Sequence, residues 1–239
     1  MTNDLSPRTR AVHTGTRRSQ YGEVSEAIFL TQGFVYDSAE QAETRFIEAG
    51  PDEFIYARYG NPTVAMFEER IAALEGAEDA FATASGMAAV SGALMSMLKA
   101  GDHVVSSNTV YGGTYALLHD FLPAKANITA TLVDICDLDA VEAAITEKTR
   151  VLYAESIANP TLRVADMPAL AEIAQRHGIK PIGTHAHEWF MFHAARFDAD
   201  RRVAAFGIDD LQEVFRDLSG NCIGRDEVVD SAQLRRRYR

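Results

Sequence analysis

The chain has 239 residues, 47% hydrophobic and 24% charged, so it can bury the core of one large domain or two small ones. A formal net charge of −11 at pH 7 argues against nucleic acid as the main partner, because a polyanion would be repelled. Two cysteines are too few for a disulfide framework. The polar start MTNDLSPRTR has no signal core, and no apolar run is long enough for a membrane span, so we expect a soluble, cytoplasmic protein.

The apolar patterns divide the chain into three parts. Residues 1–55 show little periodicity and predict an extended N-terminal arm with one or two short turns. Residues 56–183 alternate strand and helix patterns, which predicts a three-layer α/β domain with a mostly parallel sheet. Residues 184–239 lose this rhythm and predict a divergent, mainly helical tail.

Within these parts, individual elements are predicted in chain order. Helices are expected at 62–76, 86–98, 115–121, 138–145, 166–177, 186–196, 209–218 and 225–237. Strands are expected at 80–83, 103–106, 131–133, 151–154 and 179–182.

A turn of small residues, Thr83–Ala89, opens the helix expected at 86–98. Backbone N–H groups at a helix N-terminus have no intrahelical partner and lie at the positive end of the helix dipole. Gly86 permits close approach of an anionic oxygen, and Ser85 can donate its hydroxyl. The turn fits a phosphate, although tight packing of helix on sheet explains these residues equally well.

Three further motifs lie at turns or strand ends. Arg58, between Tyr56 and Tyr59, can offer a fork of donors to a phosphate or stack on the two rings. Tyr111, in VYGGTY, can cover a planar ring, although a glycine-rich connection needs no ligand. Asn159 can bind a ligand or make a turn before proline. Each motif by itself leaves both interpretations open.

In this order and spacing the motifs closely resemble the Cys/Met-metabolism family of pyridoxal-phosphate enzymes, nearest its O-succinylhomoserine sulfhydrylase branch. The segments RAVHTG, residues 10–15, and SEAIFLTQGFVY, residues 25–36, add to a likeness that runs from about residue 8 to Lys180. The resemblance implies a fold type I large domain that binds pyridoxal phosphate. It also implies a small amino-acid substrate and a homo-oligomer, either dimer or tetramer.

The resemblance assigns these residues to a cofactor site: Tyr56, Arg58, Ser85, Gly86, Met87, Tyr111 and Asn159. It implies that the N–H groups of Gly86 and Met87 hold the phosphate, and that Tyr56 and Arg58 reach the phosphate of a neighbouring subunit. Tyr111, the catalytic candidate, would stack on the pyridine ring. Asn159 would lie near the phenolic oxygen. The implied reaction replaces the succinate of O-succinylhomoserine by sulfide and gives homocysteine, in methionine biosynthesis and transsulfuration.

The family needs two later groups for this chemistry. One is an aspartate that keeps the pyridine nitrogen protonated, and its place falls here on Gly183–His185, which has no acid. The other is the Schiff-base lysine. The chain has only Lys99, Lys125, Lys148 and Lys180, none in the required context. We expect a truncated relative, weak or inactive as a sulfhydrylase. The alternatives are a non-catalytic interaction domain or pseudo-enzyme, and a fusion with an unrelated tail.

The tail begins with a histidine-rich stretch, HGIKPIGTHAHEWFMFH, at residues 177–193. Residues 180–190 resemble a short segment of nicotinate phosphoribosyltransferases. His185 and His187 alternate as a metal-binding HxH pair does, with Glu188 and His193 nearby. A working metal site needs further carboxylates, and no second cluster supplies them. We therefore expect no metal, and a helix face with core contacts explains the histidines.

Overall fold

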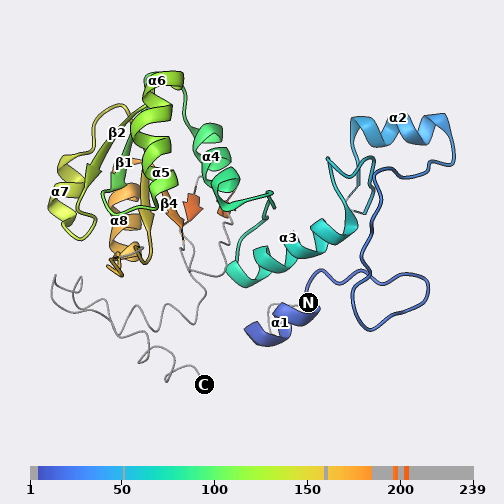
Figure 1. The fold of residues 1–239 in the computed structure, drawn as a ribbon. Helices are drawn as coiled ribbons and strands as arrows, with labels where there is room; N and C mark the ends of the chain where they lie inside the picture. Colours follow the sequence, from blue (N-terminus) through green and yellow to red (C-terminus); the bar gives the residue numbers. More distant parts are fainter. Residues whose placement is uncertain (1–4, 51, 159–160, 185–195, 199–201, 205–239) are drawn as a thin grey trace. The chain divides into compact units, whose positions relative to one another are not determined.

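The computed structural model describes residues 5–50, 52–158, 161–184, 196–198 and 202–204. The chain divides into two compact units, Met1–Ala82 and Thr83–Arg239, and each is described by itself (Figure 1). The boundary expected after residue 55 falls inside the first unit.

The first unit contains three helices among its described residues: α1 Pro7–His13, α2 Ala39–Ile47 and α3 Pro62–Glu75. Helix α3 begins at Asn61, whose side chain accepts the N–H of Thr63, and ends at Gly76 with φ 61°. These end signals confirm the sequence prediction for α3.

Helices α1 and α2 lie where the sequence predicted only an extended arm with turns. They have seven and nine residues, and each begins at a serine whose hydroxyl accepts a backbone N–H of the first turn. Ser6 accepts from Thr9 at 3.3 Å, and Ser38 accepts from Gln41 at 3.1 Å. A local cap therefore starts these helices where apolar periodicity gives little signal.

The second unit is built on a four-stranded sheet in the order β2-β1-β3-β4, and every pairing in it is parallel. The strands are β1 His103–Ser107, β2 Thr129–Val133, β3 Thr149–Glu155 and β4 Lys180–Thr184. The helices are α4 Gly86–Met97, α5 Gly112–Ala116, α6 Leu122–Ala126, α7 Leu138–Ala143 and α8 Met167–His177, with a π-helical turn at Leu117–Phe121 between α5 and α6. The predicted parallel sheet is confirmed.

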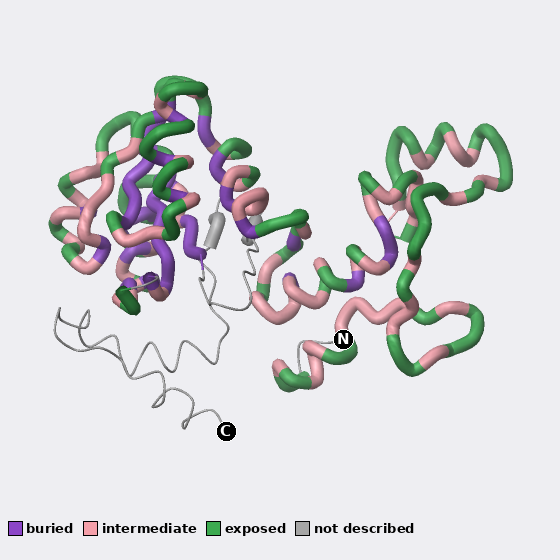
Figure 2. Tube along the Cα trace, viewed as in Figure 1, coloured by how far each residue is buried: buried purple, intermediate pink, exposed green. Residues whose placement is uncertain are grey.

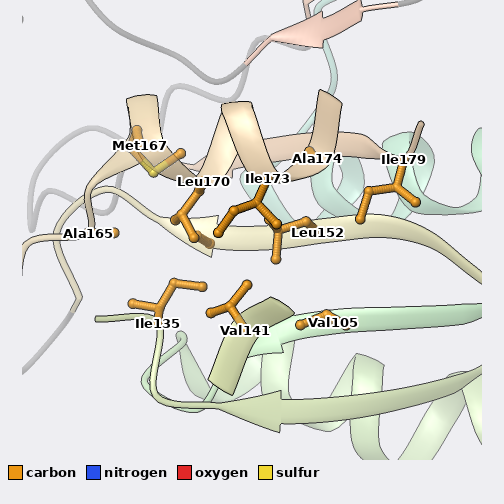
Figure 3. Packing of buried hydrophobic residues seen from close by; sticks show 11 residues of the cluster. Val105, Ile135, Val141, Leu152, Ala165, Met167, Leu170, Ile173, Ala174 and Ile179 are labelled. Atoms are coloured by element: carbon orange, nitrogen blue, oxygen red, sulfur yellow. The ribbon is translucent and has the colours of Figure 1, made fainter. Parts of the chain in front are cut away.

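Helices cover both faces of this sheet, which gives the predicted three layers. Val104 and Tyr153 face one side, where they join a buried cluster with Leu94 of α4. Val105 and Leu152, one position along each strand, face the opposite cluster, to which α7 and α8 contribute. Figure 3 shows α8 side chains pointing toward the strand that carries Leu152. Because both faces are covered, the central strands are almost continuously buried (Figure 2).

Two expectations differ from the structure. Residues 80–83 form no strand, since no described strand offers them a hydrogen-bonded partner, and Phe81 is 71% exposed.

In the tail, β5 Arg196–Asp198 and β6 Arg202–Ala204 pair antiparallel. Three-residue strands are too short to show an alternating pattern, so the sequence did not predict them. The helices expected at 209–218 and 225–237 lie outside the described residues, as does the helix expected at 186–196 except for Arg196, which begins β5.

A buried histidine joins three strands at the amino edge of the sheet. His103 of β1 bonds through Nδ1 to Thr149 Oγ1 of β3 and through Nε2 to Thr131 Oγ1 of β2, each at 2.8 Å. Burial lowers the pKa of His103 below its ordinary value of 6.5. The imidazole therefore stays neutral in the folded protein at a pH at which the unfolded chain binds a proton.

This linkage predicts loss of stability at mildly acid pH. The contribution of neutral His103 is complete above about pH 6.5 and falls as the pH drops toward the lower pKa of the folded state. His103→Leu should flatten this part of a plot of unfolding free energy against pH, measured by urea denaturation. His119→Gln removes an exposed imidazole and should keep the wild-type slope. Equal slopes in both variants would contradict the assignment.

Candidate functional site

The candidate site lies at the carboxyl edge of the sheet in the second unit. All four strands run in one direction, so the residues that end them or follow them meet at one edge. Glu155 ends β3 and pairs in register with Thr184, which ends β4. Tyr111 follows β1 and begins α5. In parallel α/β sheets this edge is where ligands bind.

The N-terminus of α4 offers two free backbone donors. Ser85 caps the helix, and its hydroxyl accepts the N–H of Ala88 at 3.2 Å while its carbonyl accepts that of Ala89 at 3.1 Å. The N–H groups of Gly86 and Met87 have no acceptor among the described residues. Two unpaired donors at the positive end of a twelve-residue helix suit an anionic group.

Tyr111 and Met87 meet at Gly113. A Cβ atom built on Gly113 would lie 2.7 Å from Cε1 of Tyr111 and 3.2 Å from Sδ of Met87. Only glycine therefore lets the tyrosine ring and the methionine sulfur approach this backbone. The backbone N–H of Tyr111 also donates to Oε1 of Glu155 at 2.7 Å. Tyr111 is nevertheless 44% exposed.

Buried hydroxyls continue the site toward β4. The hydroxyl of Tyr153 lies 2.9 Å from Oγ1 of Thr184, and the hydroxyl of Thr114 lies 3.8 Å from Sδ of Met87. Burial raises the pKa of Tyr153 to about 12, so the phenol stays protonated. Thr184 is 5% exposed. It lies in the segment Gly183–His185, where the family resemblance called for an aspartate and the sequence has no acid.

Sequence reasoning found some members of this site and missed others. The structure brings Met87 and Tyr111 together at Gly113, and Ser85 and Gly86 begin the helix that carries Met87. The sequence analysis did not assign to the site the residues that contact Met87, Tyr111 or one another at this edge: Gly113, Thr114, Tyr153, Glu155 and Thr184. They lie in α5, in β3 and at the ends of β3 and β4, and their mutual contacts were not visible in the sequence.

The other predicted binding residues of the described chain lie in the first unit. The guanidinium of Arg58 lies 5.2 Å from the ring centre of Tyr56 and 5.4 Å from that of Tyr59. The stacking interpretation of this motif is therefore correct. Among the described residues no carboxylate forms an ion pair with Arg58, so stacking leaves its N–H donors to other partners.

Some predicted residues fall where the structure gives no description. Asn159 and the histidine-rich stretch with His185, His187, Glu188 and His193 lie outside the described residues. Within the described ranges, no three histidine, cysteine or acidic side chains are grouped to hold a metal ion. None of the helices in the described part of the chain has the length and hydrophobicity that a bilayer span requires.

The lysines of the chain lie at the opposite edge of the sheet. Lys99 lies between α4 and β1, and Lys125 lies in α6, the helix before β2. Lys148 directly precedes β3, and Lys180 is the first residue of β4. At about 3.3 Å per residue, β4 and β3 separate the two edges by roughly 13 to 20 Å. No lysine side chain spans that distance through the sheet.

Comparison with known proteins identifies relatives of this chain. The model of a protein family described as "Cys/Met metabolism PLP-dependent enzyme" matches residues 8–184. The chain is 47% identical to the L-methionine gamma-lyase of Fusobacterium nucleatum subsp. polymorphum and 45% identical to the O-succinylhomoserine sulfhydrylase of Pseudomonas aeruginosa. These matches cover 70% and 71% of the chain but 42% of each relative. The chain therefore spans less than half the length of these relatives.

Solved structures agree with these matches. A putative O-acetylhomoserine (thiol)-lyase of Campylobacter jejuni, solved with a pyridoxyl-lysine phosphate, has a TM-score of 0.71 at 33% identity over 75% of this chain and 44% of its own. Cystathionine gamma-lyase of Lactobacillus plantarum has a TM-score of 0.66 at 36% identity, again over 75% and 44%. Both matches extend over three quarters of the chain and show that it shares their fold.

The donor set at the carboxyl edge fits part of a pyridoxal phosphate molecule. The free N–H groups of Gly86 and Met87 suit the phosphate, and the glycine-supported ring of Tyr111 suits a flat heterocycle. The covalent attachment does not fit, because no lysine of this chain lies at the carboxyl edge. The backbone donors that suit a phosphate are thus separated from every lysine of the chain.

The crowding at Gly113 gives a direct test of the site geometry. Gly113→Ala should be less stable than Gly112→Ala by roughly 1–3 kcal/mol, because the added methyl group of the former meets Tyr111 and Met87. Gly112 has open space around its Cβ position, so its alanine variant gains helix propensity without a clash. Chemical denaturation measures both variants, and equal stability would contradict the described packing.

Proposed function

The chain belongs to the Cys/Met metabolism family of pyridoxal-phosphate-dependent enzymes, and from this membership we propose that it binds pyridoxal phosphate non-covalently. The phosphate would occupy the N-terminus of α4, held by the N–H groups of Gly86 and Met87 and by the hydroxyl of Ser85. Tyr111 would cover the pyridine ring, and Asn159 would lie near its phenolic oxygen. When bound, the cofactor supplies an electron sink for chemistry at the carbon atoms of an amino acid.

The observation that carries this proposal is the pair of unpaired N–H groups at the N-terminus of α4, whose Met87 side chain meets the ring of Tyr111 at Gly113. A phosphate binds several such donors at once, and the dipole of the helix adds to the attraction. Tyr56 and Arg58 would add donors to the phosphate of a neighbouring subunit in a homo-oligomer. The proposed division is an arm at 1–55, a cofactor-binding domain at 56–183 and a separate tail at 184–239.

The reaction class follows from the relatives, and its efficiency follows from the residues present. We propose a weak or absent sulfhydrylase or γ-lyase activity toward small amino acids such as O-succinylhomoserine, in a cytoplasmic setting. A lysine in this chemistry holds the cofactor, exchanges with the substrate amine and carries protons. The lysines of this chain precede or begin the strands, whereas the residues of the candidate site lie at or after the strand ends. A pseudo-enzyme that keeps cofactor binding is therefore the second candidate function.

The first test places a negative charge at the phosphate site without removing the helix cap. Aspartate caps helices about as well as serine, so Ser85→Asp should fold normally, but its carboxylate repels the phosphate. We expect pyridoxal phosphate affinity to fall tenfold or more, which is about 1.4 kcal/mol. Equilibrium dialysis or isothermal titration calorimetry measures this change.

The matched control is Ser38→Asp, which makes the same exchange at the cap of α2. It should leave the affinity at the wild-type value. Unchanged affinity in Ser85→Asp, or equal losses in both variants, would place the phosphate elsewhere.

The second test concerns turnover. With saturating pyridoxal phosphate, the purified chain should form homocysteine from O-succinylhomoserine and sulfide no faster than free cofactor does. Thiol release from methionine should also stay at the rate of free cofactor, because no residue replaces the lysine. Chromatographic detection of homocysteine and a colorimetric thiol assay measure the two rates. A rate well above that of free cofactor in either assay would show that the chain is a working enzyme.

A further inference from the structure

We infer that Glu155 is a positioning residue: its buried carboxylate, at the end of β3, holds Tyr111 where the tyrosine ring meets Met87 of α4. The inference rests on the proposed function and deepens it, because Tyr111 is the residue proposed to cover the cofactor ring. In this role Glu155 acts through Tyr111 and not on the cofactor itself.

The local sequence around Tyr111 does not fix its position. Tyr111 begins the five-residue helix α5, and its side chain makes no capping hydrogen bond. The next two residues, Gly112 and Gly113, are poor helix formers, because a glycine backbone loses the most conformational entropy when it is ordered. Gly113 is nevertheless required, since a Cβ atom there would lie 2.7 Å from Cε1 of Tyr111. The close approach of ring and backbone therefore weakens the local order.

A contact from another strand supplies the missing constraint. Oε1 of Glu155 accepts the backbone N–H of Tyr111 at 2.7 Å, from a position 44 residues further along the chain. In a capping box, a glutamate at the third helical position accepts this N–H group of the capping residue. In α5 that position is Thr114, and the acceptor comes from β3 instead. A charged acceptor makes a stronger hydrogen bond than a neutral one, and negative charge suits a helix N-terminus.

Glu155 is itself held by the central sheet. It is 3% exposed and follows four buried residues of β3, and β3 pairs with both β1 and β4. Side chains alternate along a strand, so Glu155 shares a face with Tyr153, which packs in the cluster that includes Leu94 of α4. A buried carboxylate is costly unless hydrogen bonds compensate it. The bond to Tyr111 therefore ties the start of α5 to a fixed point of the sheet.

Binding measurements with two probes test this role. The probes are pyridoxal phosphate and inorganic phosphate, which has no ring for Tyr111 to cover. Glu155→Leu has no acceptor, so Tyr111 should leave its place in part of the molecules and the affinity for pyridoxal phosphate should fall about tenfold. The affinity for inorganic phosphate should stay at the wild-type value, because the donors of α4 are unchanged. Calorimetry measures both affinities, and circular dichroism checks the fold.

Two further variants serve as controls. Glu155→Gln keeps an acceptor oxygen and should restore most of the wild-type affinity for pyridoxal phosphate. Leu152→Ala shortens a buried side chain of the same strand in the cluster on the opposite face. It should lower the stability of the fold and leave the ratio of the two affinities unchanged.

A double-mutant cycle shows whether Glu155 acts through Tyr111. Tyr111→Leu should also lower the affinity for pyridoxal phosphate and leave that for inorganic phosphate unchanged. Adding Glu155→Leu to this variant should cause no further loss, because the ring that Glu155 positions is already absent. Losses that add would show that the two residues act independently.

Amide hydrogen exchange tests the positioning without any ligand. The N–H of Tyr111 should be protected in the wild-type chain and in Glu155→Gln, and should exchange at least tenfold faster in Glu155→Leu, as expected for the loss of a hydrogen bond to a charged group. Because the wild-type measurement needs no variant, an unprotected Tyr111 N–H would overturn the inference even if a variant fails to fold.

The outcomes separate the two proposals. A wild-type ratio of affinities in Glu155→Leu, equal losses in Glu155→Leu and Glu155→Gln, or additive losses in the cycle would overturn the role of Glu155 while cofactor binding stands. If neither probe binds the wild-type chain, the proposed function fails, and the part of the inference that concerns the cofactor fails with it.

Discussion

The parallel direction of the four strands is the constraint on which the site depends. Because each strand begins at the same edge and ends at the other, the chain order of residues decides which edge they occupy. Ser85–Met87 open the helix that returns from the carboxyl edge, and Tyr111, Glu155 and Thr184 follow or end strands. The lysines precede or begin strands and lie at the other edge. One topological rule thus gathers the residues of the candidate site and separates them from the lysines.

Packing then fixes the donors within that edge. The core clusters on the two faces hold α4 and α8 against the sheet, so the N-terminus of α4 has a defined place relative to the ends of β1 and β3. Gly113 lets Tyr111 and Met87 approach each other, and the hydroxyls of Thr114, Tyr153 and Thr184 continue the contacts to β4. Buried hydroxyls that bond each other cost little desolvation and make the geometry specific.

The sequence predicted those elements whose signals are local. Asn61-Pro62 and Gly76 mark both ends of α3, and the alternation of strand and helix patterns in residues 56–183 predicted all four strands of the parallel sheet. Tertiary information was needed elsewhere. The apolar residues 80–83 resemble a strand but have no partner among the described residues, and the contact of Tyr153 with Thr184 joins side chains 31 positions apart. The role of Gly113 is likewise invisible until the ring of Tyr111 is placed beside it.

The central claim is that this chain holds pyridoxal phosphate without a covalent bond to any of its lysines. Borohydride reduction of the chain saturated with cofactor, followed by peptide mass mapping, tests it most directly. We predict that Lys99, Lys125, Lys148 and Lys180 remain unmodified beyond the level found with the denatured chain, and that dialysis removes the unreduced cofactor. Stoichiometric pyridoxyl modification of one of these lysines in the folded chain would contradict the account.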